Sequence, residues 1–109
     1  MAIKAEVTTY LKSFTADVEF TDIDMSFYGP GWEIGLFFGL IPIKGKVKEL
    51  MRIAYDQIAE ITVGRASRLV KKTDVCVLKL QNGTQMEVAF IPFESGRAML
   101  YEKAADKFV

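Results

Sequence analysis

The chain has 109 residues, of which 50% are hydrophobic and 26% charged, a composition typical of one folded domain spanning residues 1–109. Its 14 Lys and Arg balance its 14 Asp and Glu. The excess of positive charge on which nucleic-acid binding depends is therefore missing, and we expect no nucleic-acid partner. The chain has no histidine and no phosphate-binding glycine loop, so we expect neither an enzyme nor a cofactor or metal site.

The N-terminal residues and the single cysteine predict where the protein resides. Residues 1–6 carry charges and lack the apolar centre of a signal peptide. Cys76 alone cannot form an internal disulfide, which suits a reducing compartment. The longest apolar stretch, residues 31–43, is shorter than the roughly 20 residues of a membrane-spanning helix and contains Glu33 and Pro42. We expect a cytoplasmic protein.

Alternation of apolar and polar residues predicts β-strands for most of the chain. Residues 3–11 would also suit one face of a helix, but the β-branched residues at 7–9 favour a strand. Over residues 17–28 the alternation changes phase at 21–22, which indicates a turn or bulge between two strands. The Gly-Pro-Gly sequence at 29–31 ends the second of these strands.

Further strands are expected at about 47–54 and 58–63, separated by a break at 55–57. The polar and basic stretch from Arg65 to Thr73 predicts a loop.

A β-hairpin is predicted for residues 75–90, because the Asn-Gly pair at 82–83 favours a tight type I′ turn. Alternation directs one set of its side chains into the core. This set is Cys76, Leu78, Leu80, Met86, Val88 and Phe90. After Pro92 the period becomes helical, so we expect an amphipathic helix over residues 94–108 with Glu94 or Ser95 as its N-cap.

Three stretches follow one another in a characteristic order. They are a strand, Thr-Asp turn and strand at 18–28, an acidic turn between spaced isoleucines at 53–61, and a hairpin with a glycine turn at 74–90. In this order they resemble GRAM and bacterial pleckstrin-homology-like (PH-like) domains. The resemblance implies a mainly β, half-open barrel of about seven antiparallel strands in two sheets, capped by one C-terminal α-helix. It also implies a role in binding phosphoinositides, other membrane surfaces or proteins.

Family members that bind phosphoinositides carry several Lys or Arg around the first hairpin. Residues 12–19 of this chain contain Lys12 alone, together with Asp17 and Glu19. We therefore expect no specific recognition of an inositol phosphate at that place.

The positive charge of the chain gathers in residues 29–72, which hold eight Lys and Arg against four Asp and Glu. An apolar segment followed by lysines is typical of an interfacial membrane contact. The predicted contact surface consists of Trp32, Phe37, Phe38, Lys44, Lys46, Lys48 and Arg52. A second basic group, in the predicted loop, consists of Arg65, Arg68, Lys71 and Lys72.

The apolar segment 32–43 has two interpretations. It is either a buried core strand or an exposed insertion that a membrane or a second copy of the chain covers. The carboxylates Asp17, Glu19, Asp22 and Asp24 lack the spacing of a calcium loop, so they predict a solvated face and no metal. We expect a non-enzymatic binding module, peripheral at the membrane, that contacts an anionic membrane surface or a protein partner. The alternative is a structural, homo-oligomeric domain.

Overall fold

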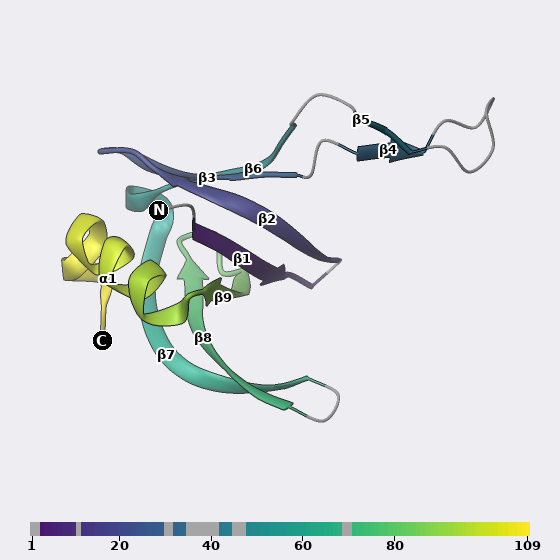
Figure 1. The fold of residues 1–109 in the computed structure, drawn as a ribbon. Coiled ribbons are helices and arrows are strands. Elements are labelled where there is room, and N and C mark those ends of the chain that lie inside the picture. The colour runs from purple at the N-terminus through teal and green to yellow at the C-terminus, as the bar shows by residue number, and fades with distance from the viewer. Residues whose placement is uncertain (1–2, 11, 30–31, 35–41, 45–47, 69–70) are drawn as a thin grey trace.

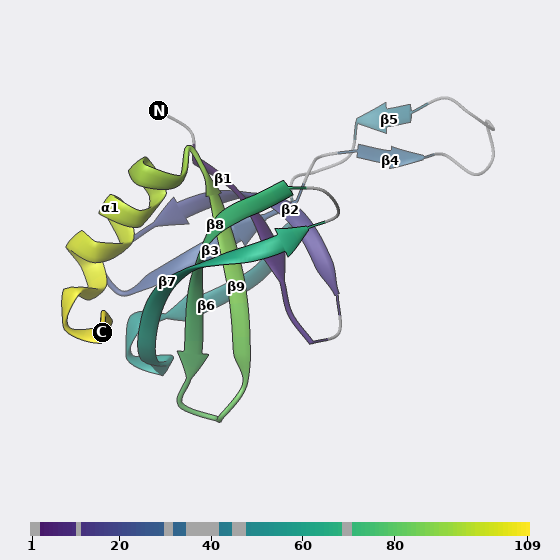
Figure 2. The same ribbon diagram turned by 90° about the horizontal axis from the view of Figure 1, so that it is seen from below.

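The computed structural model describes residues 3–10, 12–29, 32–34, 42–44, 48–68 and 71–109. Seven antiparallel strands form one curved sheet (Figures 1 and 2). They are β1 (Ile3–Thr8), β2 (Ser13–Phe20), β3 (Asp24–Tyr28), β6 (Glu49–Ala54), β7 (Ile58–Arg68), β8 (Lys71–Leu80) and β9 (Gln85–Ile91). Their order across the sheet is β6-β3-β2-β1-β9-β8-β7, so β6 and β7 are its two edges and the sheet is not closed.

Helical elements are few in the part of the chain that the structure describes. The short 3-10 turn η1 (Tyr55–Gln57) links β6 to β7, and the helix α1 (Phe93–Ala104) follows β9 and leads into the 3-10 turn η2 (Ala105–Lys107). The predicted mainly β fold with seven antiparallel strands and a C-terminal helix is confirmed, and it is compatible with a PH-like half-open barrel. The pairing is continuous from one edge to the other, so the seven strands make one sheet and not the expected two.

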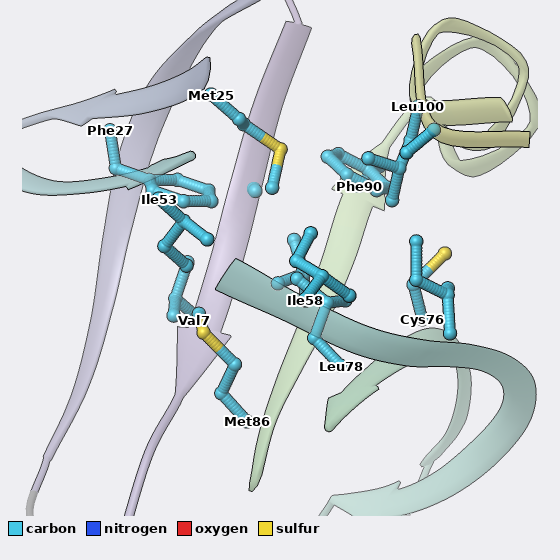
Figure 3. Close-up of a cluster of buried hydrophobic side chains, with 14 of the residues drawn as sticks. Val7, Met25, Phe27, Ile53, Ile58, Cys76, Leu78, Met86, Phe90 and Leu100 are labelled. Carbon is cyan, nitrogen blue, oxygen red and sulfur yellow. The ribbon is translucent and has the colours of Figure 1, made fainter. Parts of the chain in front are cut away.

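Strand β1 lies in the middle of the sheet and shows how the alternating sequence builds the core. Ile3, Ala5 and Val7 are buried, while the residues between them are not. The pairing of Val7 with Phe14 of β2 and with Val88 of β9 fixes the register on both sides. The N-terminal segment is thus a strand, as predicted, and its apolar side chains face the interior that the curved sheet encloses (Figure 3).

Helix α1 covers one end of this interior. Leu100 and Ala104 are buried, and Figure 3 shows Leu100 beside Phe90 of β9. At Gly96 the helix lies so close to β9 that a β-carbon would overlap the side chain of Phe90. This close approach explains why the position holds a residue without a side chain.

The ends of α1 differ from the prediction. The helix begins at Phe93, and its N-cap is Pro92, which offers no side-chain cap. The prediction of Glu94 or Ser95 as N-cap is therefore wrong; Glu94 lies in the first turn and accepts a hydrogen bond from Arg97 at 2.7 Å. The regular helix ends at Ala104, before the predicted end at residue 108.

The β8–β9 hairpin confirms the predicted faces. Cys76 pairs with Val88 and Leu78 with Met86, and all four side chains are buried. The turn is longer than a two-residue type I′ loop. Gly83 donates to the carbonyl of Leu80 at 3.0 Å, and the Leu80 amide donates to the carbonyl of Thr84 at 2.8 Å. Only the glycine supplies the positive φ, 89°, that this three-residue loop requires.

The loop predicted from Arg65 to Thr73 is a continuation of two strands, and that prediction is wrong. β7 continues to Arg68 and β8 begins at Lys71, with Arg68 opposite Lys71 in the register. The stretch lacks the alternation of apolar and polar residues by which a strand with one buried face is recognised. Figure 1 shows that this part of the hairpin extends beyond the rest of the sheet.

Candidate functional site

The apolar segment of the predicted contact surface begins and ends in two short strands, β4 (Trp32–Ile34) and β5 (Pro42–Lys44). Among the residues that the structure describes, they pair with each other, as a two-stranded sheet separate from the main one. In both views this ribbon lies beyond the ends of β3 and β6, away from α1 (Figures 1 and 2). The interpretation of residues 32–34 and 42–44 as a strand of the core sheet is therefore wrong.

The chain leaves the main sheet and returns to it at one point. The Gly29 amide, just after β3, donates to the carbonyl of Lys48, just before β6, at 2.7 Å. Lys48 is exposed, and the β4–β5 register places Lys44 opposite Trp32. The structure thus brings Trp32, Lys44 and Lys48 into one excursion from the sheet. Three members of the predicted surface, Phe37, Phe38 and Lys46, lie outside the described residues.

Arg52 belongs to a different set of contacts. Its Nε donates to Glu49 Oε1 at 2.7 Å and lies 3.7 Å from Asp24 Oδ2. The hydrogen bond that Arg52 donates to Glu49 and the charges of Glu49 and Asp24 raise the pKa of Arg52. The sequence placed Arg52 in the predicted contact surface, but the structure places it on β6, outside the ribbon, where it forms ion pairs with Glu49 and Asp24.

Asp24 is the most buried of the four predicted surface carboxylates, with 7% of the residue exposed. It accepts a hydrogen bond of 2.6 Å from the hydroxyl of Thr21. The hydroxyl of Tyr55, in η1, donates to the carbonyl of Thr21 at 2.7 Å. These contacts fix the turn between β2 and β3, which the phase change predicted, against η1.

Burial, together with the negative charges of Asp24 and Asp22, raises the pKa of Tyr55 to about 12, and burial has the largest effect. Asp22 itself is exposed and pairs with Lys103 of α1 at 2.9 Å. Among the described residues, no group of three or more His, Cys, Asp or Glu is arranged to hold a metal ion. The contacts of Thr21, Asp22 and Asp24 connect the β2–β3 turn to η1 and to α1.

The second basic group lies on the β7–β8 hairpin. Arg65 pairs with Asp74 at 3.2 Å, and both side chains are exposed. The register places Ser67 opposite Lys72 and Arg68 opposite Lys71. In Figure 1 this hairpin and the β4–β5 ribbon extend from opposite sides of β1 and β2, so the strands that carry the two basic groups lie apart.

A cavity of about 1140 Å³ opens at the end of the half-barrel that α1 does not cover. Its apolar lining comes from Met51, Ile53, Leu80 and Met86. Figure 2 shows the elements that surround it, the β8–β9 turn, η1 and the β1–β2 turn, at the lower side of the view, while α1 lies toward the upper side.

Sequence reasoning missed this cavity. Its apolar residues alternate like any core residues, and the alternation does not say whether another element covers them. The one signal was the predicted half-open barrel, which implies an uncovered opening.

Cys76 is fully buried, as predicted. Burial raises the pKa of its thiol to about 11. Only a minute fraction is therefore thiolate at neutral pH, and the residue serves as a small apolar core residue.

No protein-family model matches this chain, and no curated protein matches it in sequence. Among the described residues, no helix is both long and apolar enough to cross a membrane.

Proposed function

We propose that the protein is a non-enzymatic, PH-like binding module that docks on an anionic membrane surface. The proposed contact residues are Trp32, Phe37, Phe38, Lys44, Lys46 and Lys48. The observation that carries the proposal is the separate β4–β5 ribbon, which branches off between Gly29 and Lys48 and does not join the main sheet.

The sequence of this excursion has the composition that an interfacial contact requires. Residues 32–43 are predominantly apolar, and lysines follow at 44, 46 and 48. Apolar side chains enter the headgroup region, while each cation near anionic lipid contributes about 1 kcal/mol. The chain has a net charge of zero, so such a contact depends on local charge and not on the attraction of the whole protein.

The test uses the fluorescence of Trp32, the only tryptophan in the chain. The protein is titrated with neutral and with anionic vesicles at low and at high salt. We expect a blue shift with anionic vesicles that weakens in high salt, because screening reduces the attraction of the lysines.

A pair of charge variants makes this test specific. Lys44→Glu combined with Lys46→Glu should abolish the shift, whereas Lys4→Glu combined with Lys79→Glu, on exposed positions of β1 and β8, should leave it. A spectrum that is already blue and that no vesicle changes would contradict membrane docking. In that case light scattering at high concentration decides between a second copy of the chain and a different protein as the partner.

A further inference from the structure

We propose that the open end of the half-barrel binds a single-chain amphiphile with an anionic head, the class to which long-chain alkanoates belong. The site is the cavity beside Met51 and Met86, and it includes no residue of the ribbon. The inference therefore goes beyond the proposed membrane contact and does not depend on it.

The apolar lining supports the binding of an alkyl chain. Ile53 and Met86 are each 4% exposed, and Met51 and Leu80 are half-buried. The volume of about 1140 Å³ is somewhat larger than that of usual ligand pockets, which measure about 300–1,000 Å³, so the cavity has room for an alkyl chain. Two of the four apolar residues are methionines, whose unbranched side chains adapt to the shape of a flexible ligand.

The charges at the opening favour an anionic head on one side. Lys12, in the β1–β2 turn, borders the cavity and is exposed. Its ammonium group lies 5.4 Å from the ring centroid of Phe14, and no carboxylate of the described residues pairs with it. Arg52 also borders the cavity, but Glu49 already holds its guanidinium group.

The negative charge at the opening lies on the other side. Asp56 belongs to η1, and Figure 2 shows η1 and the β1–β2 turn at opposite sides of this end of the molecule. The head of the ligand is therefore expected at Lys12, with its chain extending over Met51 and Met86. A cationic head at the same place would be repelled by the ammonium group of Lys12.

The first experiment is a calorimetric titration of the whole chain with octanoate, decanoate, dodecanoate and tetradecanoate, each below its micellar concentration. We expect the affinity to rise about fourfold per added methylene, equivalent to about 0.8 kcal/mol, until the cavity is filled. Dodecanol and dodecyltrimethylammonium should bind more weakly than dodecanoate. An affinity that does not depend on chain length would overturn the proposal.

A matched pair of substitutions on β6 locates the site. Met51→Glu introduces a negative charge into the apolar lining and should weaken dodecanoate at least about tenfold, equivalent to about 1.4 kcal/mol. Leu50→Glu, at the adjacent position, which does not line the cavity, should leave the affinity unchanged. Equal losses in the two variants would show that the ligand binds elsewhere and would refute the site.

A second pair tests the head. Lys12→Gln should weaken dodecanoate several-fold and leave dodecanol unaffected, because only the charged head loses a partner. Lys79→Gln, an exposed lysine away from the cavity, is the control and should change neither. If Lys12→Gln leaves dodecanoate unchanged, the assignment of an anionic head is wrong. Circular dichroism and denaturation confirm that each variant is folded, so that a loss of binding is not a loss of structure.

Discussion

The two ends of the half-barrel are built from the same strands, but a helix covers one end and a cavity opens at the other. Within β9, Met86 lies at the open end and Phe90 lies beneath α1. Within β8, Cys76 lies near the helix and Leu80 lies at the cavity. At the helix end, α1 closes the interior and Leu100 is fully buried. At the open end, the described residues that border the cavity belong to β6, η1, the β8–β9 hairpin and the β1–β2 turn, and α1 does not reach it (Figure 2).

Because of this difference, we expect substitutions at the two ends to affect stability and ligand binding to different extents. Side chains beneath α1 are enclosed on all sides, so removing atoms there leaves a cavity and costs stability. Side chains at the open end already face a cavity, so the same change there costs less. The helix end is therefore expected to hold the fold together, while the open end has apolar surface left for a ligand.

The largest effect is expected from truncating the helix contact. Leu100→Ala should lower the free energy of unfolding by about 3 kcal/mol, because a fully buried side chain is replaced by an enclosed void. Met51→Ala, the counterpart at the open end, should cost about 1 kcal/mol, since Met51 is half-buried and no enclosed void forms. Urea denaturation of both variants measures the difference. Equal losses would show that the open end is packed as tightly as the helix end.

A smaller effect is expected where α1 approaches β9. Gly96→Ala gains about 1 kcal/mol of helix propensity, but its methyl group would overlap the side chain of Phe90. Overpacking typically costs about 1–3 kcal/mol, and this overlap involves the ring and the β-carbon, so we expect a net loss of about 1–2 kcal/mol. Gly64→Ala, where a β-carbon meets nothing within 4 Å, is the control. A Gly96→Ala variant as stable as the parent would mean that α1 shifts easily along β9.

The sequence predicted the helix end well, because alternation and helical spacing are direct consequences of burial. Cys76, Leu78, Met86 and Val88 were assigned to the correct face, and Leu100 recurs with Ala104 at helical spacing on the buried side of α1. The N-cap was missed because serine, present at Ser95, is one of the residues that usually cap a helix, whereas here the extended backbone of Pro92 precedes the first turn.

The sequence predicted the sites less well, because surface contacts leave no periodic signal. Charge alone grouped Arg52 with the ribbon lysines, yet the fold places it beside Glu49 and Asp24. Nothing in the residues around Met51 and Leu80 distinguishes a cavity lining from an ordinary core. That distinction depends on whether another element covers them, which only the three-dimensional arrangement decides.

The smallest of the three effects concerns η1, which borders the open end. Tyr55→Phe removes the hydrogen bond to the carbonyl of Thr21 and should cost about 1 kcal/mol at neutral pH. The folded state raises the pKa of Tyr55 from 10.0 to about 12, so it favours the neutral phenol. This contribution is complete below pH 10 and is lost as the pH rises toward 12.

Urea denaturation at a series of alkaline pH values should therefore show the parent losing stability faster than Tyr55→Phe, so that the difference between them narrows. Tyr101→Phe, at a residue that is 53% exposed, is the control and should follow the parent. A Tyr55→Phe variant with the stability and pH profile of the parent would mean that the hydrogen bond to Thr21 does not hold η1 in place. In that case η1 would be held by the β8–β9 turn, where the Gln81 amide donates to the carbonyl of Gln57 at 2.8 Å. Because Asp56 and Gln57 of η1 border the cavity, this turn would then define the opening of the cavity.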